Sequence, residues 1–302
     1  MSAGDLSVTI APEIGAGIAD FSLAGPLGWR YPLLRRAPAE PSGPGELGCF
    51  LLTPWCNRIR GASFRFRGRE HRLRPNWPDG TAIHGVGWRR AWSITDRSPV
   101  HARLEYDSRG DRDVNFPFPF RSAVRYELFP DRLAIELDVE NVGPEAMPAG
   151  LGLHPYFPRT LWTHEDAVEL SVPNRGEFPA RGCLPTGPAE ATPSSVQFAR
   201  GSALGSPGVD SAYEGLSGPI EVRWPASGVA LRMESSEACG KAVVFTPEAA
   251  PGRPLAWFCA EPVTMLNDGF NLLEEGWTNT GVRALEPGER LAMRTVMVVT
   301  RT

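Results

Sequence analysis

The stretch RLAIELDVEN, residues 132–141, alternates apolar and polar side chains over its whole length. Leu133, Ile135, Leu137 and Val139 share one face of an extended chain, and the opposite face is largely charged. Successive side chains of a strand point to opposite faces, so this period of two predicts a half-buried β-strand.

Similar runs recur along the chain, most of them bounded by Gly, Pro, Asp or Asn. Strands are predicted at residues 63–68, 102–107, 121–129, 229–234, 241–247 and 290–300. Residues 127–137 are interpreted as the end of one strand and the start of the next, joined at Pro130-Asp131. The sequence contains no convincing long amphipathic helix.

Turn residues favour an all-β fold, because 32 glycines and 30 prolines are spread along the chain. Many short strands with many turns are typical of a β-sandwich or barrel. Residues 38–48 and 176–193 are proline-rich and are interpreted as long surface loops. Without a linker or an internal repeat, we expect one domain over residues 1–302, with 42% apolar residues available for a large core.

Charge and cysteine content exclude several classes of protein. The formal net charge is −4, which gives no electrostatic reason to expect nucleic acid or a membrane as a partner. Lys241 is the only lysine, which makes Schiff-base chemistry a poor expectation. The N-terminus does not resemble a signal peptide and the five cysteines are irregularly spaced. We therefore expect a cytoplasmic protein.

Four short stretches gather polar and aromatic residues where strands are predicted to end. They are TPWCNRIRG (53–61), AIHGVGWRRAW (82–92), GLHPYF (152–157) and FCAEPVTMLNDGFN (258–271). A sugar offers hydroxyl groups around its edge and weakly polar C–H faces, which suit Arg, Asn, Asp and His for the edge and aromatic rings for a face. Together the stretches predict a site for a polyhydroxylated ligand.

Each of these residues also has a structural interpretation. His84 and His154 could each be satisfied by one backbone hydrogen bond, and Trp88 could belong to the core. Asn57-Arg58 could form a turn with a solvated arginine. Glu261 follows an apolar run, and a buried carboxylate without a partner is costly, so it is either functional or paired with an arginine.

Taken in order, the four stretches resemble the aldose 1-epimerase family, also called galactose mutarotases. The resemblance rests on Asn57-Arg58-Ile59, His84-Gly85, His154-Pro155-Tyr156-Phe157 and Glu261-Pro262. The segments FRFRGREHRL, LPTG and LEPGERL also look like that family, so the resemblance runs from about residue 10 to residue 300.

The resemblance implies a single large antiparallel β-sandwich of the galactose mutarotase-like kind, without a metal or organic cofactor. Glu261 looks like the general base and His154 like the general acid, while Arg58, His84 and Asp210 are similar to sugar-binding positions. Asn57, Tyr156 and Trp88 complete the expected substrate-binding set. The substrate implied is a free monosaccharide whose α and β anomers are interconverted.

The chemistry of mutarotation agrees with these roles. The anomeric O1 hydroxyl must lose a proton and the ring oxygen O5 must gain one, so that the hemiacetal opens, rotates about C1–C2 and closes again. A proton acceptor and a proton donor suffice, each worth about 10² to 10⁴-fold. We expect Glu261 and His154 on opposite sides of the O1–C1–O5 unit.

Departures from the family pattern leave the substrate open. Trp55 precedes Asn57 and could wall the pocket, and MLNDGFN follows Glu261-Pro262 in altered form while keeping Asn267, Phe270 and Asn271. The alternatives are a hexose-6-phosphate 1-epimerase, a glycoside hydrolase using Glu261 with Asp210, and a sugar-binding protein without turnover. The first would need cations for a phosphate, and the residues available near the motifs are Arg89, Arg90 and Arg159. A monomer and a homodimer are both compatible with the sequence.

Overall fold

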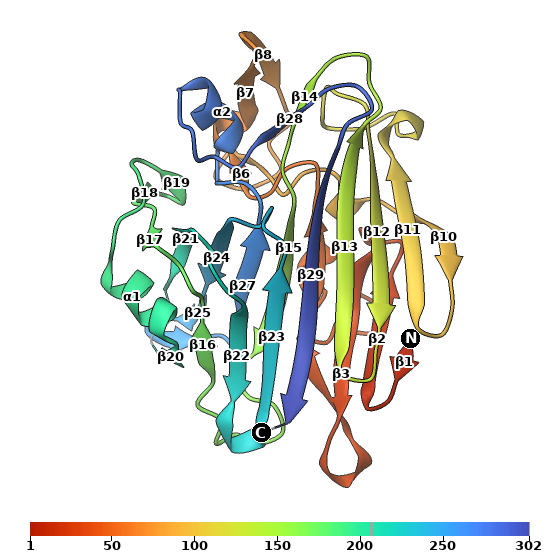
Figure 1. Ribbon diagram of the computed structural model, residues 1–302, viewed down its shortest axis with the longest axis vertical. Helices are drawn as coiled ribbons and strands as arrows, with labels where there is room; N and C mark the ends of the chain where they lie inside the picture. Colours follow the sequence, from red (N-terminus) through yellow and green to blue (C-terminus); the bar gives the residue numbers. More distant parts are fainter. Residues whose placement is uncertain (206–207, 302) are drawn as a thin grey trace.

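The computed structural model describes residues 1–205 and 208–301 (Figure 1). Two large antiparallel sheets lie one behind the other in this view, and the side chains between them form the core. The all-β prediction and the β-sandwich architecture are confirmed.

The first sheet has ten strands in the order β1-β2-β3-β5-β15-β27-β24-β21-β17, with β4 paired to β3. Its strands are β1 (Ser2–Ala3), β2 (Leu6–Ala11), β3 (Gly17–Ala24), β4 (Arg30–Leu34), β5 (Cys49–Leu52), β15 (Gly152–Pro158), β17 (Gly176–Glu177), β21 (Asp210–Glu214), β24 (Lys241–Phe245) and β27 (Trp257–Val263).

The second sheet has nine strands in the order β10-β11-β12-β13-β29-β23-β22-β16-β20. Its strands are β10 (Ser93–Arg97), β11 (His101–Asp107), β12 (Phe120–Leu128), β13 (Arg132–Asn141), β16 (Glu169–Ser171), β20 (Ser202–Ala203), β22 (Ile220–Trp224), β23 (Val229–Ser235) and β29 (Arg290–Arg301).

Two-stranded ribbons and short helices make up the rest of the described secondary structure. The ribbons are β6 (Arg58–Ile59) with β9 (Ala82–Ile83), β7 (Ser63–Phe66) with β8 (Arg69–Arg72), β14 (Met147–Ala149) with β28 (Arg283–Leu285), β18 (Ala180–Arg181) with β19 (Leu184–Pro185), and β25 (Glu248–Ala250) with β26 (Arg253–Pro254). The helices are α1 (Pro193–Arg200), α2 (Gly269–Glu274) and the 3-10 turns η1 (Pro26–Gly28), η2 (Pro44–Glu46), η3 (Arg60–Ala62), η4 (Gly87–Arg89), η5 (Ser108–Gly110) and η6 (Pro225–Ser227). None of the helices in the described part of the chain has the length and apolar character needed to cross a bilayer.

The strands predicted from alternation are present. The alternating stretch at residues 132–141 is β13, and the other predicted runs correspond to β7, β11, β12, β23, β24 and β29. The β12–β13 hairpin turns at Pro130-Asp131 as predicted, with the Phe129 amide donating to the Arg132 carbonyl at 2.8 Å. The apolar face of β13 is buried, whereas Glu136 is exposed.

The interpretation of residues 176–193 as one long loop was wrong. This segment contains β17 and the β18–β19 hairpin, whose strands are too short to show alternation. Residues 38–48 contain only η2 and are otherwise irregular, as predicted.

Polar contacts join the two sheets at three places in the core. Tyr126 of β12 donates its hydroxyl to the Ala16 carbonyl at 2.8 Å, and the Trp224 indole of β22 donates to the Pro158 carbonyl at 2.9 Å. Thr53, just after β5, lies 2.7 Å from the Ser122 hydroxyl of β12. Buried polar groups paired in this way cost little, and they hold the ten-stranded sheet in one position against its partner.

The alternation of β13 gives a stability prediction. Leu137→Ala should lower the free energy of unfolding by about 2 to 5 kcal/mol, because it leaves a cavity between the sheets. Glu136→Ala, one residue away on the exposed face, should change it by no more than about 0.5 kcal/mol. Urea unfolding monitored by fluorescence would measure both, and equal losses would contradict the assignment of faces.

Candidate active site

Alternation along the central strands of the ten-stranded sheet places selected side chains on one face. In β15, Leu153 and Phe157 pack into the core, while His154 and Tyr156 line a cleft. The pairing of β15 with β5 sets Phe50 beside His154. On the other side of β15, β27 brings Glu261 to the same cleft.

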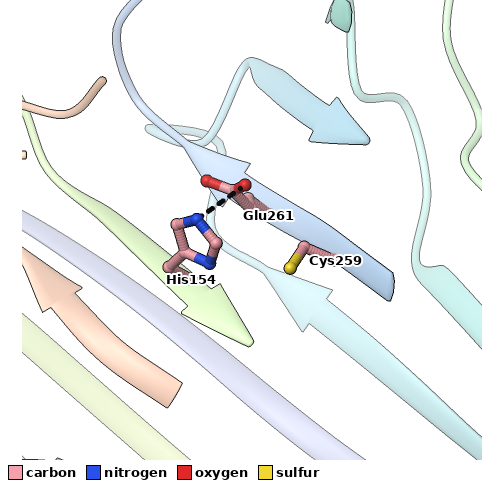
Figure 2. A group of neighbouring side chains, drawn as sticks. All are labelled: His154, Cys259 and Glu261. Atoms are coloured by element: carbon pink, nitrogen blue, oxygen red, sulfur yellow. Dashed lines mark ion pairs between the residues drawn. The ribbon is translucent and has the colours of Figure 1, made fainter. Parts of the chain in front are cut away.

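His154 and Glu261 are in direct contact (Figure 2). Their closest atoms, the imidazole Nε2 and the carboxylate Oε1, are 3.2 Å apart. Both residues are almost fully buried, with 7% and 2% of their surfaces exposed. The distance between the two functional groups is therefore short enough for a proton to be shared.

Burial favours the uncharged form of each group. It raises the pKa of the Glu261 carboxyl well above its usual range, and the nearby Asp210 carboxylate raises it further. It also lowers the pKa of His154 to about 3. The pair has two arrangements that differ only in the position of one proton. In one, Glu261 is a carboxylic acid and His154 is neutral; in the other, Glu261 is a carboxylate and His154 is an imidazolium. The contact can thus act as a one-proton pair.

The imidazole of His154 lies against two aromatic rings. Its ring centroid is 4.4 Å from that of Phe50 and 4.8 Å from that of Tyr156, with interplanar angles of 24° and 23°. The centroids of Phe50 and Tyr156 are themselves 6.1 Å apart, so the two rings border the imidazole on adjacent sides and restrict its orientation. Its Nδ1, like Glu261 Oε2, finds no hydrogen-bond partner among the described residues.

Two further site residues have left-handed backbone conformations. Asn57 has φ +57° and His84 has φ +63°, values that non-glycine residues adopt only at some energetic cost. The His84 amide donates to the Asn57 carbonyl at 3.0 Å, which ties the two segments together. Burial and the neighbouring His154 lower the pKa of His84 well below its usual range, so its imidazole is neutral.

Arg58 and Asp210 form a charged wall of the cleft. The Arg58 Nε donates to Asp79 Oδ2 at 2.9 Å, so its guanidinium is ion-paired and not simply solvated. The Cys183 thiol lies 3.1 Å from Asp210 Oδ2. Residues 206 and 207, a few positions before Asp210, lie outside the described residues.

All eight residues predicted for the site line one cleft of about 630 Å³. They are Asn57, Arg58, His84, Trp88, His154, Tyr156, Asp210 and Glu261. The volume is within the range of small-molecule sites. The structure thus brings together residues that are separated by up to about 200 positions in the sequence.

Several lining residues were not predicted. Phe50, Trp77, Val243 and Phe245 contribute apolar surface, and residues 41–45 form part of the wall. Val243 and Phe245 are two residues apart in the predicted strand 241–247, so the sequence predicts that they share one face of the sheet. The sequence does not predict which face of the sheet borders the cleft, because that depends on strand order.

Some expectations about the surroundings of the site were wrong. Trp55 does not wall the pocket: it is fully buried in the core, with its ring 5.5 Å from that of Phe116. His154 and Glu261 lie side by side on neighbouring strands with their closest atoms 3.2 Å apart, which leaves no room between them for the O1–C1–O5 unit that was expected there.

Cys259 lies next to this pair, and its sulfur completes a group of three ligand atoms within 4.8 Å of one another (Figure 2). A metal would need the thiolate. Burial raises the pKa of Cys259 well above its usual range, with the nearby Glu261 adding to the effect. The group therefore gives no positive reason to assign a metal, and a metal-free site stays a prediction.

Comparison with known proteins agrees with the fold. The chain is 26% identical to a candidate aldose 1-epimerase from Escherichia coli K12 of known crystal structure, with a TM-score of 0.85 over 100% of this chain and 98% of that one. A galactose mutarotase-like protein from Clostridium acetobutylicum is 18% identical, with a TM-score of 0.86 over 100% and 94% of the two chains. The protein is thus a single-domain β-sandwich of the galactose mutarotase-like class.

Sequence comparison gives the family. The aldose 1-epimerase family model matches residues 1–297. The uncharacterised protein YphB of E. coli K12 is 31% identical over 274 residues, which cover 86% of this chain and 87% of YphB. The chain belongs to the aldose 1-epimerase family, as the motifs indicated.

The conformation at His84-Gly85 gives a testable prediction. A Cβ on Gly85 would lie 2.1 Å from the Thr53 carbonyl oxygen, whereas a Cβ on Gly68, at the same φ of +77°, would meet nothing within 4 Å. Gly68→Ala should therefore cost only the strain of a left-handed alanine, about 1 to 2 kcal/mol. Gly85→Ala should cost at least about 2 kcal/mol more, because backbone must move. Thermal unfolding of the two variants would measure the difference, and equal losses would contradict the close approach.

Proposed function

We propose that this protein is an aldose 1-epimerase that interconverts the α and β anomers of a free aldose by general acid–base ring opening and closure. The observation that carries the proposal is the 3.2 Å contact between His154 and Glu261 at the floor of a cleft lined by polar and aromatic side chains.

Ring opening needs two proton transfers on neighbouring atoms. Glu261, as the carboxylate, accepts the proton of the O1 hydroxyl while His154, as the imidazolium, donates a proton to O5. The C1–O5 bond breaks and C1 becomes an aldehyde carbon. After rotation about C1–C2, O5 attacks the other face of C1 and both protons return. The pair ends in its starting state.

Side-by-side catalysts suit this reaction. O1 and O5 are both bonded to C1, so two adjacent groups on one side of the sugar can each reach one oxygen. Once the shared proton is on His154, the imidazolium is the acid and the Glu261 carboxylate is the base. Burial removes water from the Glu261 carboxylate. Hydrogen bonds from sugar hydroxyl groups would take the place of that water and so favour the charged arrangement.

The cleft walls supply complementary contacts for a monosaccharide. Arg58, Asn57, His84 and Asp210 present donors and acceptors for hydroxyl groups, and Tyr156 and Trp88 contribute aromatic atoms to the lining. In this proposal these six residues bind and orient the sugar, and they do not transfer protons.

The first functional prediction concerns the base. Glu261→Gln should lower kcat for anomer exchange by about 10² to 10⁴-fold, because the amide cannot accept the O1 proton. Sugar binding should persist, since the amide keeps a similar shape and hydrogen-bonding capacity. Saturation-transfer NMR on free aldoses would measure exchange, and calorimetry would measure binding.

Glu136→Gln is a suitable control, because Glu136 is exposed on the nine-stranded sheet and should leave both quantities unchanged. Exchange that survives Glu261→Gln at the wild-type rate would refute the assignment of the base. A wild-type protein that binds sugars without accelerating exchange would instead favour a binding protein, and release of the leaving group from an aryl glycoside would favour a hydrolase.

One observation favours a second candidate, a hexose-6-phosphate 1-epimerase. Of the three arginines considered for a phosphate, the described lining of the cleft includes Arg89 but neither Arg90 nor Arg159. The Arg89 guanidinium stacks over Trp88, 4.2 Å from the ring centroid. Arg90, by contrast, pairs with Asp111 at 2.6 Å. Burial alone accounts for the lowered pKa of Arg89, with no contribution from a carboxylate among the described residues.

This second candidate can be separated from the first by substrate. Arg89→Met should lower kcat/KM for glucose 6-phosphate by tenfold or more and leave that for glucose nearly unchanged, because only the phosphate uses the cation. Arg132→Met is a matched control, since Arg132 stacks over Phe129 at 4.1 Å on the remote β12–β13 hairpin. A strong wild-type preference for the phosphosugar that Arg89→Met abolishes would replace the free aldose as substrate.

A further inference from the structure

The stack that holds His154 continues beyond Tyr156 to a cation. Arg35, the residue after β4, places its guanidinium carbon 3.8 Å from the centroid of the Tyr156 ring and 5.0 Å from that of Trp257. Tyr156 in turn stacks on His154, so the guanidinium, the phenol ring and the imidazole are in successive contact. Arg35 therefore supports the ring against which the imidazole rests.

Arg35 also connects the floor of the cleft to its wall. Its Nη2 donates to the Leu47 carbonyl at 2.8 Å and to the Gly45 carbonyl, and its backbone amide donates to the Tyr156 carbonyl at 2.7 Å. Residues 41–45 line the cleft. One side chain thus links a wall segment, the floor strand β15 and the aromatic stack.

The charge of Arg35 is not neutralised by a close ion pair within the described residues. Glu46 favours the cation only at longer range, and burial is the main reason why the pKa of Arg35 is lowered. The other ionisable groups around His154 are Glu261 and Cys259 on β27, His84 beyond β9, Arg58 on β6, Asp210 on β21 and Tyr156 on its own strand. Apart from the effect of burial, Arg35 is the charge that lowers the pKa of His154.

We propose that Arg35 is a positioning residue for the acid–base pair, which fixes the plane of His154 through Tyr156 and whose charge biases the pair towards its neutral arrangement. The inference rests on the proposed function for its kinetic consequence. It has two separable parts, because a guanidinium is both planar and charged, and different substitutions remove one property at a time.

Arg35→Gln keeps a planar polar group and removes the charge. Loss of this positive charge raises the pKa of His154, so the alkaline limb of the pH–rate profile, on which the acid loses its proton, should move to higher pH by up to about one unit. Arg35→Lys keeps the charge and loses the planar stack and its paired carbonyl contacts. Its limbs should stay in place while kcat falls about tenfold through poorer orientation.

The experiment is a pH profile of anomer exchange, measured by saturation-transfer NMR on the full chain. Wild type, Arg35→Gln and Arg35→Lys are compared with Arg36→Gln, in which the neighbouring surface arginine that pairs with Asp20 is replaced. The control removes the same charge outside the stack and should leave both limbs and kcat unchanged. An alkaline limb of Arg35→Gln that coincides with that of wild type would overturn the electrostatic part, and an unchanged kcat in Arg35→Lys would overturn the positioning part.

A second readout keeps the inference testable apart from catalysis. The ¹⁵N shifts of the His154 imidazole report its protonation directly, and they should titrate at higher pH in Arg35→Gln than in wild type. Wild-type protein without anomer exchange would refute the proposed function, while the titration would still decide the effect of Arg35. If Arg35→Gln fails to fold, Arg35→Met, which also lacks the charge, takes its place, and an unshifted His154 titration there refutes the inference.

Discussion

The close contact between His154 and Glu261 is the constraint on which the rest of the site depends. Two ionisable groups with nearly no exposed surface would each be costly alone, because burial penalises their charged forms. Placed 3.2 Å apart, they can share one proton in either arrangement. The price of burial is thus reduced by pairing, and the same pairing supplies a proton acceptor and a proton donor at neighbouring points.

The fold secures this contact through the register of its strands. A slip of one residue in β15 or β27 would turn His154 or Glu261 into the core and bring an apolar neighbour to the cleft. Large buried rings on both sheets oppose such a slip, since every inward side chain would lose its packing. Polar contacts between the sheets, such as that of Thr53 with Ser122, add to the same effect. The core therefore determines which face of these strands borders the cleft.

The loops complete the site at a local energetic cost. Asn57 and His84 adopt left-handed conformations, and Gly85 approaches the Thr53 carbonyl more closely than a side chain would permit. Such strain persists where the surrounding structure over-determines it.

Two arginines lie at different distances from the interior of the cleft. Arg89 lines the cleft beside Trp88, whereas Arg35 lies against Tyr156 and does not line the cleft among the described residues. Their different placements are the reason why Arg89 is proposed to act on a ligand and Arg35 on the acid–base pair.

Much of this could be predicted from the sequence, because alternation, turn residues and local motifs are properties of neighbouring positions. The strand at residues 132–141, the turn at Pro130-Asp131 and the family motifs around Asn57, His84, His154 and Glu261 were all identified in that way.

The tertiary structure alone decided what depends on strand order and side-chain packing. It placed Trp55 in the core, brought Phe50 against His154 and Arg35 over Tyr156, and set the two catalytic candidates side by side. Pairings such as that of β5 with β15 join segments about 100 residues apart. No local pattern encodes them, because the burial and the contacts that select them exist only once the sheets have formed.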